Sequence, residues 1–264
     1  MAEHDWEPDV YAQFAELRAR PFWDLADLID QSRPIQSMVD LGCGSGELTV
    51  ALADLLAAED AVGVDSSISM LNAAAAHARD SRRFQPGNIG SWAAPSPVDL
   101  IVANASLQWV ADHKHVVGRW LDSLRAGGQI AIQVPANANH PSHTCSVAVA
   151  AREPFASAMG GAPPPDPVAE NVLRPEEYAE LLHRLGVVDP HVRLQVYAQL
   201  MPSSSAVVDW TSGTSLTRFF KALPHELHEP FVDAYRHELL ATIGDVSPYF
   251  YAFKRILMAG RLAD

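Results

Sequence analysis

The most constraining feature of the sequence is a glycine-rich turn that directly follows a short apolar run. The run covers residues 35–41, and the turn reads Gly-Cys-Gly-Ser-Gly at 42–46. Apolar side chains then recur at helical spacing over 47–56. Glycine adopts backbone conformations that other residues avoid, and it lets a ligand approach the chain closely. A buried strand, a glycine turn and a helix in this order predict an α/β fold with a ligand at the turn.

Strands and helices continue to alternate through the first half of the chain. Strands are predicted at 61–64, 84–85, 98–103 and 129–134, and helices at 68–78 and 113–124. The strand at 98–103 is almost continuously apolar, which is typical of a strand covered on both faces. Alternation with short connections indicates a doubly wound, mainly parallel sheet of the Rossmann-like type.

The second half of the chain contains more helix. Helices are predicted at 142–159 and 175–185, two or three more at 203–243, and strands at 192–200 and 249–258, with a proline-rich linker at 160–167. We therefore expect a single domain over 1–264 with a seven-stranded sheet and an added helical cap. Its core would comprise 35–135, 187–201 and 248–262, and its cap 1–30, 140–185 and 203–245.

Composition and charge limit the partners of the chain. The formal net charge of −13 would repel a polyphosphate, which argues against nucleic acid. No apolar run approaches the roughly 20 residues that span a bilayer, and the acidic N-terminus does not resemble a signal peptide. Two distant cysteines, Cys43 and Cys145, suit a reducing compartment. We expect a cytoplasmic protein with no membrane partner, which is a monomer or a weak homo-oligomer.

Two classes of cofactor could occupy the glycine turn. A dinucleotide site requires a third glycine where this chain has Glu47, whose carboxylate would oppose a pyrophosphate. The arrangement D-x-G-x-G-x-G at 40–46, with the acid Asp40 before the glycines, instead resembles the first motif of class I methyltransferases. A second acid, Asp65, ends the second strand. S-adenosylmethionine carries no phosphate, and its sulfonium and ammonium favour a nearby carboxylate. Asp65 would accept both ribose hydroxyls.

Further residues fit the same cofactor. Asn88 and Ile89 follow the third strand, where they would contact the adenine, although simple packing is an equal reading for Ile89. Asn104 follows the fourth strand and would face the methionine end. The full set predicted to bind S-adenosylmethionine, and its product S-adenosylhomocysteine, is Asp40, Gly42, Gly44, Gly46, Asp65, Ser66, Asn88, Ile89 and Asn104.

The segment Asn-Ala-Ser-Leu-Gln-Trp at 104–109 differs from the motif of enzymes that methylate the exocyclic amines of bases. Together with WEPDVYAQF at 6–14, VDLGCGSGELT at 39–49 and IQVP at 132–135, it resembles the trans-aconitate methyltransferase family. The resemblance extends over essentially the whole chain. It implies methyl transfer to a carboxylate of trans-aconitate or of a similar small polycarboxylate, giving a monomethyl ester. Two departures are Asn88, where relatives often have Asp, and a basic residue shifted to Arg218.

The chemistry of this reaction sets what the substrate site must contain. A carboxylate is already ionised at neutral pH, so no general base is required, and Gln108 and Trp109 would act by positioning. A polycarboxylate does require cations and hydrogen-bond donors. The residues predicted to bind substrate are Tyr11, Arg18, Gln108, Trp109, His140, His143, Arg218 and Arg255. No metal is predicted, because no acid or cysteine cluster accompanies the two histidines.

Two alternatives remain open from the sequence. The chain could methylate a different acid or a hydroxylated metabolite, in which case a general base should lie near the methyl group. It could also be an S-adenosylmethionine-binding module without turnover, in which case the space beside the cofactor should be filled.

Overall fold

The computed structural model describes residues 15–264, with side chains from Ala19 onward. The chain divides into two compact units. The one that we call the sheet unit contains Arg18–Pro135, Asn171–Gln195 and Arg255–Asp264. The other, the helical unit, contains Ala136–Glu170 and Val196–Lys254. The core and cap boundaries expected from the sequence stay a prediction.

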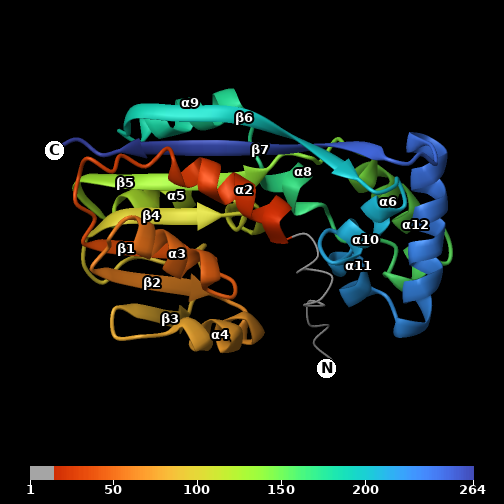
Figure 1. Ribbon diagram of the computed structural model, residues 1–264. Coiled ribbons are helices and arrows are strands. Elements are labelled where there is room, and N and C mark those ends of the chain that lie inside the picture. Colours follow the sequence, from red (N-terminus) through yellow and green to blue (C-terminus); the bar gives the residue numbers. More distant parts are fainter. Residues whose placement is uncertain (1–14) are drawn as a thin grey trace. The chain divides into compact units, whose positions relative to one another are not determined.

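Within residues 15–264, seven strands form one sheet in the order β3-β2-β1-β4-β5-β7-β6 (Figure 1). The pairs β1–β2, β1–β4, β2–β3 and β4–β5 are parallel, whereas β7 runs antiparallel to β5. This arrangement confirms the predicted doubly wound, mainly parallel sheet. The strands are β1 (Ser37–Leu41), β2 (Asp60–Asp65), β3 (Arg82–Pro86), β4 (Val98–Asn104), β5 (Leu124–Pro135), β6 (Val188–Met201) and β7 (Tyr249–Arg261).

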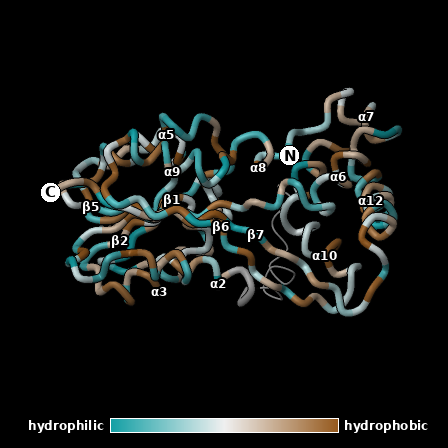
Figure 2. The backbone as a smooth tube through the Cα atoms, turned by 90° about the horizontal axis from the view of Figure 1, so that it is seen from above, coloured by the Kyte–Doolittle hydropathy of each residue, from teal (hydrophilic) through white to brown (hydrophobic). Residues whose placement is uncertain are grey.

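Helices cover both faces of the sheet unit. α2 (Ala15–Ala26) and α3 (Glu47–Leu55) lie on one face, and α5 (His113–Leu121) and α9 (Pro175–Arg184) on the other (Figure 2). α4 (Ile68–Ala74) follows β2. On the first face, one cluster of buried apolar side chains joins α2 and α3 to alternate residues of the strands, which explains why β4 is apolar along almost its whole length.

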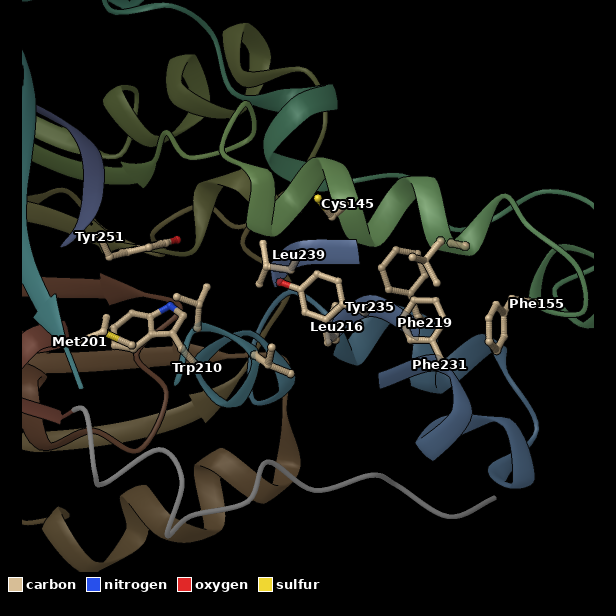
Figure 3. Packing of buried hydrophobic residues seen from close by; sticks show 14 of the residues in the cluster. Cys145, Phe155, Met201, Trp210, Leu216, Phe219, Phe231, Tyr235, Leu239 and Tyr251 are labelled. Carbon is tan, nitrogen blue, oxygen red and sulfur yellow. The ribbon is translucent and has the colours of Figure 1, made fainter. Parts of the chain in front are cut away.

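The helical unit has a separate aromatic core. Its helices are α6 (Pro141–Ala150), α7 (Phe155–Ala158), α8 (Pro167–Asn171), α10 (Ala206–Ser212), α11 (Thr217–Ala222) and α12 (His228–Ile243). Trp210, Phe219, Phe231 and Tyr235 pack together among them (Figure 3). The Tyr235 hydroxyl donates to the carbonyl of Ser142 at 3.0 Å, so this buried polar group is satisfied and ties α12 to α6.

Among the boundaries that differ from the sequence prediction, two have a clear physical reason. The helix expected at 142–159 is interrupted after Ala150, because Pro154 has no N–H to continue the helical hydrogen bonds. The helix expected at 113–124 ends at Leu121, and Leu124 already pairs with Val98 in the sheet. The glycine pair at 127–128 therefore lies inside β5 and does not end a helix.

Candidate functional site

The glycine turn after β1 is held tightly against its neighbours on one side. Gly42, Gly44 and Gly46 all have positive φ, at 86°, 56° and 81°. A Cβ on Gly42 would lie 2.2 Å from the Cβ of Ser106, so no side chain fits there. At Gly44 a Cβ would meet nothing within 4 Å. The turn thus requires glycine for its backbone, and it leaves its Gly44 side accessible to a ligand.

Asp40 lies near the end of β1, next to the glycine turn, and is buried. Its Oδ2 accepts a hydrogen bond of 2.6 Å from the Thr49 hydroxyl of α3. Its Oδ1 is buried and has no partner among the described residues. Burial raises the pKa of Asp40 to about 6, and the charge of Asp65 adds to this, while the Thr49 hydrogen bond opposes it. A carboxylate with one vacant oxygen in this position favours a cationic ligand.

Asp65 ends β2 and organises the turn. Its Oδ2 accepts from the backbone N–H of Gly44 at 2.9 Å, and its Oδ1 accepts from that of Ser67 at 2.8 Å. Ser67 caps α4 by accepting from the N–H of Met70, whereas Ser66 is exposed. Each carboxylate oxygen keeps a second lone pair for a hydroxyl donor.

Asn88 and Ile89 follow β3, as the sequence predicts. The side-chain oxygen of Asn88 accepts from the N–H of Gly90 at 2.9 Å. The indole of Trp120 donates to the carbonyl of Ile89 at 3.0 Å. These bonds fix the loop to α5, and they occupy one lone pair of the Asn88 oxygen that was expected to face an adenine amino group.

The segment after β4 forms a short 3-10 helix, Leu107–Trp109. His113 fixes it, because its Nε2 lies 3.0 Å from the carbonyl of Leu107 while its Nδ1 lies 2.7 Å from the hydroxyl of Tyr178. Gln108 is buried and donates through Nε2 to the carbonyl of Ala105, and its Oε1 has no partner in the described part of the chain. Trp109, in contrast, is 55% exposed. The segment therefore presents a buried amide and an exposed indole.

Three of the residues predicted to bind substrate lie in the helical unit. His140 caps α6, where its Nδ1 accepts from the N–H of Ser142 at 3.1 Å. Burial lowers the pKa of His140 to about 4, and the nearby positive charges of His143 and Lys254 act in the same direction. His140 is therefore neutral at pH 7, with its proton on Nε2, and can serve as a hydrogen-bond donor but not as a cation.

His143 and Arg218 come together on a third residue that the sequence analysis missed. The Nδ1 of His143 and the Nη2 of Arg218 lie 2.6 and 3.7 Å from the Oδ2 of Asp166. Although burial alone would raise it, the pKa of Asp166 is lowered by the hydrogen bond and charge of His143 and by the charge of Arg218. The Asp-Pro pair at the start of α8 was the available signal, since it is typical of a helix cap.

The guanidinium of Arg218 is only partly satisfied. Its side chain is 9% exposed, and one nitrogen donates to the carbonyl of Ser215 at 3.0 Å. Nε and Nη2 have no hydrogen-bond partner within residues 15–264. This edge of a guanidinium is the one that binds a carboxylate in a bidentate manner.

Of the remaining residues predicted to bind substrate, one lies in the sheet unit and two lie outside the described side chains. Arg255 lies on β7 in register with Pro135, at the carboxyl end of β5, and belongs to the sheet unit. Tyr11 and the side chain of Arg18 lie outside the described residues. Over the part of the chain that is described, no group of three or more His, Cys, Asp or Glu side chains is arranged to hold a metal ion. No helix there is long and apolar enough to cross a membrane.

Comparison with known proteins identifies the family. Residues 38–128, from β1 to β5, match a family model described as a methyltransferase domain. The trans-aconitate 2-methyltransferase of Deinococcus radiodurans is 39% identical over 254 residues, which cover 96% of each chain. That of Mycobacterium tuberculosis is 34% identical, with 97% of each chain covered. The chain belongs to the trans-aconitate 2-methyltransferase family.

The fold of solved proteins agrees with this assignment. The YcgJ protein of Bacillus subtilis superposes with a TM-score of 0.60 at 16% identity, covering 92% of this chain and 98% of that one. At this level of identity the likeness concerns the fold alone.

The residues at the glycine turn fit the methyl donor of the family, S-adenosylmethionine. Asp40 offers a buried acceptor without a partner, which suits the cationic methionine end. The turn is open at Gly44, and Asp65 ends the adjacent strand with lone pairs for the ribose hydroxyls. Glu47, at the start of α3, would in contrast oppose a dinucleotide pyrophosphate.

Proposed function

We propose that this protein is an S-adenosylmethionine-dependent carboxyl O-methyltransferase that forms a monomethyl ester of trans-aconitate or of a similar small polycarboxylate. The observation that carries the proposal is the match to trans-aconitate 2-methyltransferases along 96–97% of both chains. The protein acts on a small anionic partner in the cytoplasm, without nucleic acid, membrane or metal, as a monomer or a weak homo-oligomer.

The sheet unit binds the methyl donor. S-adenosylmethionine supplies an electrophilic methyl group on its sulfonium. Asp65 accepts hydrogen bonds from the ribose hydroxyls, and Asp40 and Asn104 face the methionine end. The glycine turn, Ser66, Asn88 and Ile89 complete the site. These roles rest on the position of each residue at the carboxyl ends of β1 to β4, where ligands of open α/β sheets bind.

The methyl acceptor needs no general base. A carboxylate with a pKa near 4 is ionised at neutral pH, so the protein only has to align its oxygen with the methyl group. Gln108 and Trp109 provide this alignment from the segment after β4. A buried amide and an exposed indole can position a carboxylate, and neither accepts a proton.

The other carboxylates of the substrate are held by donors and cations. Arg218 binds one of them through Nε and Nη2, which have no hydrogen-bond partner in the described part of the chain, and Asp166, itself paired with His143, is its ion-pair partner at 3.7 Å. Arg255, the neutral donor His140, and Tyr11 and Arg18 of the N-terminal segment are further contacts. The positive charges of these arginines offset the repulsion that a net charge of −13 exerts on an anion.

Turnover with labelled S-adenosylmethionine over a panel of acids tests the proposal. The panel contains trans-aconitate, tricarballylate, a dicarboxylate, a monocarboxylate and a hydroxylated acid. We expect label transfer to the polycarboxylates only, with the product identified as a monomethyl ester by mass spectrometry and by its lability to alkali. Transfer to a hydroxyl, giving an alkali-stable ether, would replace the proposal by the hydroxyl-methylating alternative. Binding of the donor without transfer to any acid would replace it by a non-catalytic module.

A further inference from the structure

Four strands of the sheet unit carry polar side chains in a row at the edge formed by the carboxyl ends of β1, β4 and β5, with the antiparallel β7 beside them. Asp40 is in register with Val102 of β4, which places Asp40 on the same face of the sheet as Asn104, two residues beyond Val102. Asn104 is in register with Gln133 of β5. Across the antiparallel pair, Pro135 is in register with Arg255 of β7, which puts Arg255 on that face too.

Three members of this row have a buried polar atom without a partner. These atoms are the Oδ1 of Asp40, the Oδ1 of Asn104 and the Nε2 of Gln133. Asn104 and Gln133 lie on neighbouring strands in register, and yet their amides make no hydrogen bond with each other in the described part of the chain. Gln133 is 1% exposed. A buried N–H without an acceptor is destabilising, so its retention points to an acceptor that a ligand supplies.

The row changes polarity along the sheet. β1 and β4 offer acceptors, from Asp40 and Asn104, whereas β5 and β7 offer a donor and a cation, from Gln133 and Arg255. The acceptor side suits the cationic methionine end of the methyl donor. The donor side suits an anion placed beside it.

We infer that Gln133 positions the reacting carboxylate of the substrate, by donating a hydrogen bond from Nε2 to the oxygen that is not methylated, with Arg255 next to it. The inference rests on the proposed function and adds to it the strand against which the acceptor carboxylate lies. A hydrogen bond to one oxygen of the carboxylate leaves the other oxygen free to face the methyl group.

The position of β5 in the sheet indicates that the partner of Gln133 is the substrate and not the methyl donor. Neighbouring strands are about 4.8 Å apart, so β5 lies about 14 Å along the sheet from β2 and about 10 Å from β1. The ribose is assigned to Asp65 on β2, and the methionine end to Asp40 on β1 and Asn104 on β4. β5 is the next strand of the sheet after β4, so Gln133 lies beyond the residues assigned to the donor, next to its methionine end.

β5 also provides a matched control. Gln129 lies on the same strand and the same face as Gln133 and is also buried. Its amide is fully used within the fold, because Oε1 accepts from the N–H of Asp30 at 2.8 Å and Nε2 donates to the carbonyl of Asp30 at 3.0 Å. One buried glutamine is thus satisfied by the fold and the other is not.

The test compares Gln133→Met with Gln129→Met, which remove the same amide from the two positions. For Gln133→Met we expect the KM of the polycarboxylate to rise by about 10- to 100-fold, the range for a hydrogen bond to a charged group. Its melting temperature should be unchanged or higher. Its affinity for S-adenosylhomocysteine, measured by calorimetry, should be unchanged. For Gln129→Met we expect a lower melting temperature and an unchanged KM. Gln133→Glu, which replaces the donor by an acceptor, should impair turnover more than Gln133→Met.

Three results would overturn the inference. An unchanged KM in Gln133→Met would remove Gln133 from the substrate site. A loss of affinity for S-adenosylhomocysteine with an unchanged KM would assign Gln133 to the methyl donor. A fall in melting temperature equal to that of Gln129→Met, with no change in KM, would make its role structural.

A failure of this inference can be distinguished from a failure of the proposed function. If the unmodified protein turned over no polycarboxylate, the proposed function would fail, and the inference would be decided by calorimetric binding of tricarballylate in the presence of S-adenosylhomocysteine. Binding to the unmodified protein that weakens in Gln133→Met would support it. Equal binding to both proteins, or binding to neither, would refute it.

Discussion

The substitution Asp40→Asn should stabilise the protein and weaken its binding of the methyl donor at the same time. Asp40 is buried with one vacant oxygen, and its pKa rises from 3.8 to about 6. Because the pKa is higher in the folded than in the unfolded chain, the contribution of Asp40 to stability is fully present below 3.8 and is lost as the pH rises through about 6. The difference of about 2 pKa units corresponds to about 3 kcal/mol in the free energy of unfolding.

Asparagine removes this cost while it keeps the hydrogen bond from Thr49, since its side-chain oxygen still accepts. Denaturant unfolding at pH 4 and pH 8 measures the effect. The stability of Asp40→Asn relative to the unmodified protein should increase between these pH values, by an amount approaching 3 kcal/mol at most. Asp60→Asn, which removes a partly exposed carboxylate from β2, controls for the change in net charge.

Calorimetry provides the second half of the prediction. The affinity of the unmodified protein for S-adenosylmethionine should fall below about pH 6, because a protonated Asp40 no longer attracts a cation. Asp40→Asn should bind weakly at every pH. If the variant were no more stable at pH 8 than the unmodified protein, or if the stability difference did not change with pH, the conclusion that burial raises the pKa of Asp40 would be refuted.

Three further predictions concern the site and its chemistry. Asp65→Ala should weaken S-adenosylmethionine binding by about 1.5–3 kcal/mol in calorimetry, with little change in substrate KM at saturating donor. An unchanged affinity would mean that Asp65 only holds the backbone of Gly44 and Ser67 through its hydrogen bonds. The rate at saturating substrates should vary little between about pH 6.5 and 8.5, and a steep loss traceable to one histidine would contradict a carboxylate nucleophile. Arg218→Met should raise the KM of a tricarboxylate more than that of a dicarboxylate in steady-state assays, whereas an equal effect on both would remove Arg218 from carboxylate binding.

The fold was predictable because its signals are local. Glycines at the end of a buried strand, and near-continuous apolar residues in 98–104, need only the neighbouring sequence to be recognised. The errors arose where long-range pairing decides the outcome. Leu124 has helical spacing with α5, but it pairs with Val98 of β4 in the sheet. Tertiary context overrides periodicity at such a position.

The positions of the candidate site residues were predictable where these residues follow strands, and not where their partners come from distant segments. Asp40, Asp65 and Asn104 could be placed because parallel strands bring their carboxyl ends to one edge. The pairing of Asp166 with His143 joins a linker to a helix 23 residues earlier, and no spacing in the sequence encodes it. Nor does the sequence distinguish Gln133 from Gln129, since only the contacts of each amide reveal which one is satisfied.

The pairing of β5 with β7 has a consequence for the order of folding. It joins Gln129 to Arg261 and Pro135 to Arg255, so roughly 120 residues or more separate the partners, including both segments of the helical unit. Closing so long a loop slows folding, because the chain loses entropy before the contacts form. During synthesis, β1 to β5 emerge well before β7, and the row that ends at Arg255 cannot be completed until the last strand has arrived. Refolding should therefore pass through a state in which the glycine turn has formed while the edge of β5 is still exposed, and that edge is where association between unfinished chains would begin.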